Sequence, residues 1–291
     1  MNEKDESELN ALVSLIDEPS EEIFEGIALK ILSFGTAAIP VLLEKSENTF
    51  DSMVLQRLQE INYEIQFAAL CADLEGKKDL DDYEMIEMCI RLARLEHYKV
   101  KEDDIRTQIE IILRDIWIQL NDQQPDPEKI TFINHVIYDT NGFTGNTESF
   151  YDLKSAYLNT LLETHKGNAV SLGILYIIIA RQLHLPVYGV DLPGQFILAF
   201  MDETEEGEGQ PQVNDVRFYI NPFYKGAIFS RKEVERYLMD IKVEPQEKYF
   251  LPCSNLDIIS IHISELIAIY SKIDQKRKVK DLKKLLQIVN K

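Results

Sequence analysis

The chain has 291 residues, of which 45% are apolar and 28% charged, a composition typical of a globular protein and unlike that of a collagen-like or disordered chain. Its 50 acidic and 31 basic residues leave a net charge of -19, which repels polyanions. We therefore expect no binding to nucleic acid or to an anionic membrane surface.

The cysteines and histidines indicate neither a disulfide framework nor a metal centre. Cys71, Cys89 and Cys253 lie far apart and outside any CxxC pair. The five histidines show no HxxxH or HExxH spacing, and the sequence has no glycine-rich phosphate loop. We expect no metal, no nucleotide and no other cofactor.

The scattered cysteines fit a reducing compartment, and together with the features below they predict a cytoplasmic protein. The segment MNEKDESELN at the start lacks the apolar stretch of a secretory signal. The longest apolar run, Leu172 to Ala180, is followed at once by Arg181, so it is too short to span a bilayer. The oligomeric state stays open.

Residues 1–75 are predicted to form a helical domain. Apolar residues three and four apart indicate helices over 8–17, from about 20 to 34, around Pro40, and over 50–67. A HEAT-type stack of helix pairs and an unrelated helical bundle both fit, because no repeat of fixed length is visible. The polar stretch EGKKDLDD has the composition of a linker, so we place a boundary near residue 76.

Residues 76–250 are predicted to form a mixed domain that begins with helices. The periodicity indicates helices over 83–95, 102–120, 128–138 and 169–183. Trp117, the only tryptophan, falls in the apolar pattern of the second of these helices. We expect it to pack in the core.

Strands follow these helices and give the domain a small antiparallel sheet. Two strands are expected over 187–193 and 195–202, separated by the turn pair Pro193-Gly194. The acidic segment 203–215 indicates an exposed hairpin loop, after which 216–223 forms a third strand antiparallel to the second. With a short helix over 231–239, the fold class is α+β and predominantly helical.

Residues 251–291 are predicted to form a helical pair whose second half is basic. The run KIDQKRKVKDLKKLL is typical of a solvated helix face that offsets the acidic remainder of the chain. Docking of an acidic partner on this face is the alternative.

Three short motifs carry a resemblance to a known family. KGNAVSLGILY opens a helix, GVDLPGQFILAF spans the first two strands, and YINPFYKGAIFS ends the third strand. In this order they resemble the transglutaminase-like superfamily, and within it the SirB-type family, from about residue 10 to the C-terminus. The resemblance implies a papain-like or transglutaminase-like core at 76–250, flanked by a HEAT-like section at 1–75 and a tetratricopeptide-like pair at 251–291.

The resemblance also assigns three positions to a degenerate catalytic triad. Active members of the superfamily carry a cysteine at the helix start, a histidine on the next strand and an aspartate or asparagine on the strand after. These places fall on Asn168, Gln195 and Asn221. Because a carboxamide neither transfers protons near neutral pH nor acts as a nucleophile, we expect no catalytic residue among them.

Two roles for the three amides stay open. They offer hydrogen-bond donors and acceptors without charge, which suits recognition of a peptide backbone or of an Asn or Gln side chain. Equally, they can form a closed hydrogen-bond network that holds the helix to the sheet. A cysteine or a pair of ionisable groups in the same pocket would contradict an inert scaffold.

The leading hypothesis is a catalytically inactive binding or regulatory protein that recognises a protein or peptide. The alternative is a hydrolase or acyltransferase of the transglutaminase or cysteine-protease class that uses displaced residues, Ser171 and His165. We expect Ser171 instead to donate to the carbonyl four residues earlier, as serine in an apolar helix commonly does. A purely structural helical-repeat adaptor is the third hypothesis.

Overall fold

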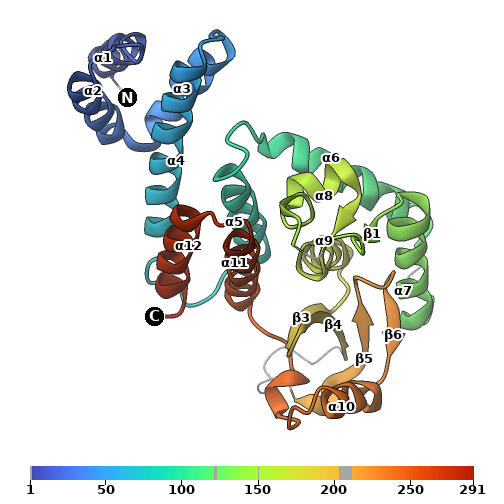
Figure 1. The fold of residues 1–291 in the computed structure, drawn as a ribbon. Coiled ribbons are helices and arrows are strands. Elements are labelled where there is room, and N and C mark those ends of the chain that lie inside the picture. Colours follow the sequence, from blue (N-terminus) through green and yellow to red (C-terminus); the bar gives the residue numbers. More distant parts are fainter. Residues whose placement is uncertain (1, 121–122, 150, 203–211) are drawn as a thin grey trace. The chain divides into compact units, whose positions relative to one another are not determined.

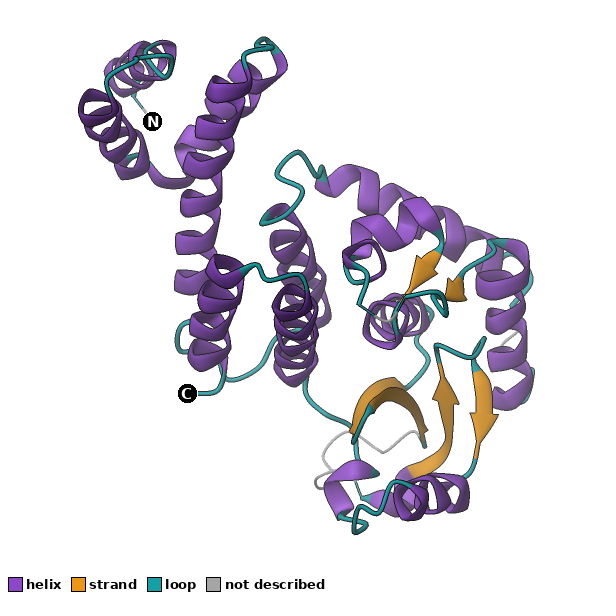
Figure 2. Ribbon diagram, in the orientation of Figure 1, coloured by secondary structure: helices purple, strands orange, loops and turns teal. Residues whose placement is uncertain are grey.

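The computed structural model describes residues 2–120, 123–149, 151–202 and 212–291, most of which are helical (Figure 1, Figure 2). They divide into two compact units, Met1–Glu75 with Ile90–Val100, and Gly76–Cys89 with Lys101–Lys291. The predicted α+β class with predominant helix is confirmed.

The first unit is entirely helical in its described residues. Its elements are α1 (Glu3–Ser14), α2 (Glu21–Ser33), the 3-10 turn η1 (Gly35–Ala38), α3 (Ile39–Glu47), α4 (Ser52–Leu74) and the end of α5 (Asp82–Arg94). Asp51 begins α4 because its carboxylate accepts the amides of Met53 and Val54 at 2.8 and 3.2 Å. Buried aliphatic side chains at helical spacing fill the core, among them Leu9, Val13, Ile27, Ile31, Leu58, Ile61 and Ile65.

One charged side chain is buried in this core. The Arg57 guanidinium donates to the carbonyls of Ile16 and Glu18 at 2.9 and 2.7 Å and to the Glu21 carboxylate at 2.8 Å. It also lies 3.8 Å from the ring centre of Phe24. The guanidinium thus satisfies the carbonyls that follow α1 and ties α4 to the start of α2.

Among the described residues, no single helix is both long and apolar enough to cross a membrane. The segments Glu21–Ser33 and Gly35–Glu47 reach that length and composition when taken together, and a 112° bend separates them.

The second unit surrounds a small sheet with helices (Figure 1, Figure 2). Before the sheet come α6 (Glu102–Trp117), α7 (Asp126–Asn134), the π-helical turn η2 (His135–Thr140), η3 (Leu153–Ser155), α8 (Leu158–Thr164) and α9 (Ala169–Gln182). After it come α10 (Arg231–Asp240), η5 (Glu247–Tyr249), α11 (Asn255–Lys272) and α12 (Lys276–Val289).

The main sheet is antiparallel throughout, in the order β3-β4-β5-β6. Its strands are β3 (Val187–Leu192), β4 (Gln195–Met201), β5 (Val216–Asn221) and β6 (Ala227–Phe229). Pro193 and Gly194 make the turn between β3 and β4, with Gly194 at φ +78°, the conformation that a type II turn requires at that position. A separate pair, β1 (Thr144–Gly145) and β2 (Lys166–Gly167), is parallel, and η4 (Val213–Asp215) precedes β5.

Strand β4 is buried on both faces, which explains its unbroken apolar sequence. Ile197, Ala199 and Met201 pack in a cluster with Val234 and Leu238 of α10. On the other face Phe196 lies against α9, where a Cβ on Gly173 would stand 2.6 Å from its ring. This packing fixes the start of β4 against the N-terminal half of α9.

Some predictions about these elements are wrong or incomplete. Trp117 is 73% exposed rather than packed in the core, because the buried face of α6 is formed by Ile105, Ile109, Ile112 and Ile116. The next residue on a helix is turned about 100° away from that face. Strand β6, α8 and the β1–β2 pair were not predicted, and most of the expected hairpin loop, 203–211, lies outside the described residues.

Candidate functional site

A cavity of about 500 Å³ lies at the N-terminus of α9. The turn between β3 and β4, the end of β5, one side of α11 and residues of the segment after β1 also line it. The lining residues are Asn146, Ser149, Tyr151, Asn168, Ala169, Val170, Asp191, Gly194, Gln195, Phe196, Asn221, Phe223, Tyr224, Ile261, Glu265 and Ala268. The three amides selected from the sequence, Asn168, Gln195 and Asn221, are therefore brought to one cavity.

Asn168 is the N-cap of α9 and forms a reciprocal capping box with Ser171. Its side-chain oxygen accepts the Ser171 amide at 2.8 Å, and its own amide donates to the Ser171 hydroxyl oxygen at 3.1 Å. The other end of the carboxamide, Nδ2, is buried without a hydrogen-bond partner among the described residues. One half of Asn168 thus serves the fold, and the other half is an unused donor beside the cavity.

The other two amides differ in how they are held. The Asn221 side-chain oxygen accepts the amides of Phe223 and Tyr224 at 3.1 and 3.2 Å, which shapes the turn after β5. Gln195 is partly buried, and its side chain has no hydrogen bond within the described part of the chain. No hydrogen bond joins Asn168, Gln195 or Asn221 to one another in that part of the chain, so the closed amide network is not formed.

Two carboxyl groups that the sequence analysis did not select also line the cavity. Burial raises the pKa of Glu265 on α11 above its ordinary range. Partial burial, together with the negative charge of Asp257, raises the pKa of Asp191 at the end of β3, which Lys248 offsets in part. The pocket therefore holds two ionisable groups, which is the finding that we stated would contradict an inert scaffold, and these groups can exchange protons.

A sequence signal was available for only one of these carboxyls. Asp191 lies within the motif GVDLPGQFILAF, on the same predicted hairpin as Gln195, but the resemblance assigned it no role. Glu265 lies on a helix that begins more than sixty residues later, and no local pattern places it beside this hairpin.

The displaced residues Ser171 and His165 do not line the cavity. Ser171 is 2% exposed, and its hydroxyl donates to the Ser155 carbonyl at 2.7 Å and to that of Asn168 at 3.3 Å, not to the carbonyl four residues earlier as expected. His165 is the left-handed C-cap of α8 at φ 58°, with its ring stacked on Phe143 at 4.6 Å. Neither is arranged as a nucleophile or base for this cavity.

The cysteines are equally remote from thiolate chemistry. Burial raises the pKa of Cys89 to about 12. Burial also raises the pKa of Cys253 to about 12, helped by the carboxylates of Asp257 and Asp191. The Cys253 thiol donates to the Gly189 carbonyl at 3.2 Å. The thiols of Cys89 and Cys253 therefore stay protonated at neutral pH, and none of the three cysteines lines the cavity.

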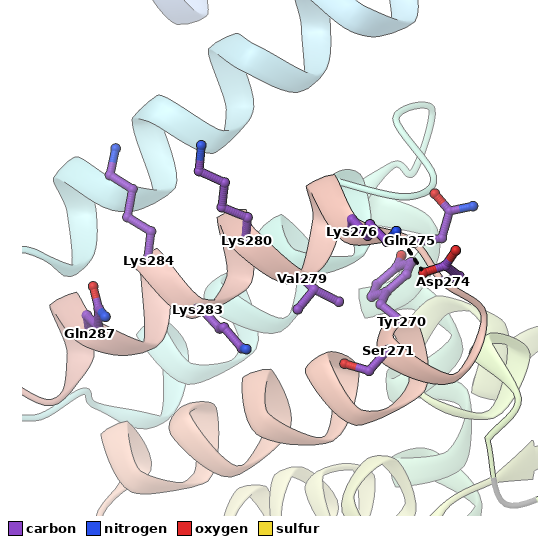
Figure 3. A pocket seen from close by; sticks show the side chains of 10 residues that line it. All are labelled: Tyr270, Ser271, Asp274, Gln275, Lys276, Val279, Lys280, Lys283, Lys284 and Gln287. Atoms are coloured by element: carbon purple, nitrogen blue, oxygen red, sulfur yellow. Dashed lines mark ion pairs between the residues drawn. The ribbon is translucent and has the colours of Figure 1, made fainter.

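A second cavity, of about 700 Å³, lies along α11 and α12 and is basic (Figure 3). Figure 3 shows Lys280 and Lys284 on the side of α12 that points away from α11, and Lys283 and Val279 on the side toward it. Lys276 pairs with Asp274 at 3.8 Å. The lysines of this second cavity contrast with the lining of the first cavity, which we call the amide cavity because Asn168, Gln195 and Asn221 line it.

Comparison with known proteins agrees with the fold around the amide cavity. Residues 103–263, more than half of the chain, match the family described as the transglutaminase-like superfamily. A UPF0162 protein of Vibrio cholerae is 24% identical over 165 residues, 57% of each chain, and one of Pasteurella multocida is 34% identical over 156 residues, 52% of this chain and 57% of that protein. F-box only protein 21 of Homo sapiens is 33% identical over 103 residues, 35% of this chain and 16% of that protein.

These matches are partial in length. The chain spans little more than half of the Vibrio cholerae and Pasteurella multocida relatives, and much less of the F-box protein. No solved structure matches.

Proposed function

Because this chain belongs to the transglutaminase-like superfamily, we propose that it is a catalytically inactive, SirB-type member that binds a protein or peptide in the cavity at the N-terminus of α9. The superfamily core provides a preformed pocket, and the chemistry within that pocket is recognition rather than bond cleavage.

The observation that carries the proposal is the set of residues at the three triad positions. Asn168 uses its side-chain oxygen to cap α9, and Asn221 uses its own to hold a turn, while Gln195 carries no ionisable group. Among the described lining residues there is no cysteine and no histidine. Asp191 and Glu265 can exchange protons, but the one serine among the described lining residues, Ser149, makes no hydrogen bond to either carboxyl.

The geometry of Ser171 argues against the alternative, a hydrolase or acyltransferase with displaced residues. A serine nucleophile needs a base that accepts its proton, and here that proton is donated to a backbone carbonyl. The buried position of Ser171 inside the capping box also keeps substrate from its oxygen.

We further propose the wider organisation that the resemblance implies. Residues 1–75 act as a HEAT-like section, residues 76–250 as a papain-like core, and residues 251–291 as a tetratricopeptide-like pair, with the helical sections offering protein-contact surfaces in the cytoplasm. The packing of α1 to α4 around one core and of α11 beside α12 supports this proposal. The net charge of -19 supports partners other than nucleic acid and anionic membranes.

The test combines turnover with binding. Purified chain is incubated with amide, ester and acyl-transfer substrates, and peptide binding is followed by NMR at the side-chain amides of Asn168, Gln195 and Asn221. We expect no turnover, and peptide-induced shifts at these amides. Turnover that disappears in Gln195→Ala, Asp191→Asn or Glu265→Gln would overturn the proposal.

A matched pair of variants separates the cavity from the helical surfaces as the binding site. Gln195→Ala should weaken peptide binding, whereas Gln246→Ala, an exposed glutamine that does not line the cavity, should leave it unchanged. Binding that survives Gln195→Ala and is lost on changing an exposed helical face would favour the adaptor hypothesis instead.

A further inference from the structure

The charged groups that line the amide cavity are all acidic among the described residues. Its described lining contains the carboxyls of Asp191 and Glu265 and no lysine, arginine or histidine. Within the described residues neither carboxyl has an ion pair or a side-chain hydrogen bond. Glu265 is half-buried without a partner, which destabilises its charged form, and Asp191 adds a second, exposed carboxyl to the same lining, so a cation that enters the cavity can pair with both.

The walls of the cavity suit an alkyl chain that ends in a cation. Phe196 and Phe223 line it together with the exposed rings of Tyr151 and Tyr224, and the Phe223 and Tyr224 rings meet edge to face at 5.2 Å. The rim already shows this kind of contact, because the Lys272 ammonium lies 5.1 Å from the centre of the Tyr151 ring. Aromatic faces attract ammonium and guanidinium groups, and their apolar surface packs against the methylene stem.

Whereas the carboxyls favour a cationic group on the ligand, the start of α9 favours a hydrogen-bond acceptor. Asn168 is 9% exposed, and its Nδ2 lacks a hydrogen-bond acceptor among the described residues, although the residue lines the cavity. A buried donor without a partner destabilises the fold, so a ligand oxygen that accepts from it is favoured there. The positive end of the 14-residue helix favours the same kind of group.

One ligand class meets both requirements. Building on the proposed binding role, we infer that the cavity takes a basic peptide segment, in which a lysine or arginine side chain pairs with Asp191 and Glu265 while a backbone carbonyl accepts from Asn168 Nδ2. A cavity of about 500 Å³ has room for one long side chain and its peptide group. A free polyamine lacks the carbonyl, and a metal ion lacks the ligand set, since the described residues contain no cluster of three candidate ligands.

The experiment uses the full chain and five peptides, acetyl-Ala-Ala-X-Ala-Ala-amide, in which X is lysine, arginine, norleucine, glutamine or glutamate. Dissociation constants come from NMR titration, with spermidine as a sixth probe. We expect the lysine and arginine peptides to bind about ten times more tightly than the norleucine peptide, and the glutamate peptide to bind weakest.

Three variants assign the contacts. Asp191→Asn and Glu265→Gln should each weaken the lysine peptide several-fold and leave the norleucine peptide unchanged. Asn168→Ser keeps an oxygen that caps the helix but removes Nδ2, so it should weaken the lysine and norleucine peptides alike. Glu163→Gln, an exposed acid that does not line the cavity, is the matched control and should change nothing.

The outcomes separate this inference from the function on which it rests. If lysine and norleucine peptides bind equally and both are lost in Gln195→Ala, the binding role stands and the basic-peptide inference falls. If spermidine binds as tightly as the lysine peptide and Asn168→Ser has no effect, the peptide part of the inference falls. Peptide cleavage or acyl transfer in the same samples would overturn the proposed function itself.

Discussion

The first unit and the second unit hold charged side chains in opposite ways. In the first unit, Arg57 is buried against two carbonyls, one carboxylate and an aromatic ring. In the second unit, Glu265 is half-buried and Asp191 is exposed, and neither has such partners among the described residues. A buried charge with partners inside the fold is structural, whereas a charge without partners that lines a cavity marks a candidate site.

Removing the satisfied charge should have the largest effect. Arg57→Ala leaves the carbonyls of Ile16 and Glu18 without their donor, and each buried acceptor left unpaired costs on the order of 1–3 kcal/mol. We expect a loss of about 3 kcal/mol, measured by urea unfolding with hydrogen exchange at the α1 and α2 amides. The exposed pair Lys30–Glu8 is the control, and Lys30→Ala should cost below about 0.5 kcal/mol. Equal losses would remove the distinction between the two kinds of charge.

Acid should destabilise the second unit through His262. Burial lowers the pKa of His262 to about 4, although its Nε2 bonds the Ala156 carbonyl at 3.0 Å. Between pH 6.5 and 4 the unfolded chain takes up a proton that the folded chain does not, so the free energy of unfolding falls as the pH falls through this window, by up to about 3 kcal/mol.

His262→Gln keeps a side-chain donor for the Ala156 carbonyl and cannot titrate. Its unfolding free energy should therefore change less between pH 6.5 and 4 than that of the natural chain, as measured by urea unfolding at each pH. An identical pH dependence in the two chains would show that His262 is not the group that titrates.

The capping box should give the next largest effect. Asn168→Ala removes the oxygen that accepts the Ser171 amide, and loss of an N-cap costs about 1–2 kcal/mol. Asn168→Ser retains a cap and should lie within about 0.5 kcal/mol of the natural chain in thermal unfolding. If Asn168→Ser is as unstable as Asn168→Ala, the carboxamide nitrogen serves the fold rather than a ligand.

The unsatisfied carboxyls should give the smallest effect and the opposite sign. The raised pKa of Glu265 means that the folded chain holds its proton to higher pH than the unfolded chain, so stability falls as the pH rises through this range. Glu265→Gln should therefore stabilise the protein at pH 7, by on the order of 0.5 kcal/mol, and have no effect in acid where both states are protonated. Destabilisation at pH 7, measured against Glu163→Gln, would assign Glu265 a structural role.

Much of the architecture could be predicted because its signals are local. The helices over 169–183 and 255–291 and the turn at Pro193-Gly194 follow from periodicity and turn chemistry, and they are confirmed with small shifts in their bounds. Strand β6 could not be predicted because it has three residues and relies on its pairing with β5. Trp117 was placed in the core because a periodic pattern does not show which side of a helix is left uncovered.

The sequence predicted the three amides of the candidate site but not its two carboxyl groups. Asn168, Gln195 and Asn221 meet because a helix start and two strand ends come together at one edge of the core. Asp191 lies on the same predicted hairpin as Gln195, whereas Glu265 joins them from a helix that no local pattern connects to the sheet. The hydrogen-bond state of each amide likewise depends on tertiary neighbours, such as the Ser155 carbonyl beside Ser171.

The ring of Phe196 carries one more consequence. It fills the space that a Cβ would occupy at Gly173 on α9, and also at Gly189 on β3, where the approach would be 2.7 Å. Among related chains, the residues at these three positions should therefore vary together. A residue larger than glycine at 173 or 189 should occur only where the side chain at 196 is smaller than phenylalanine. Such covariation would show that the contact between α9 and the sheet, next in sequence to Gln195, is under evolutionary constraint.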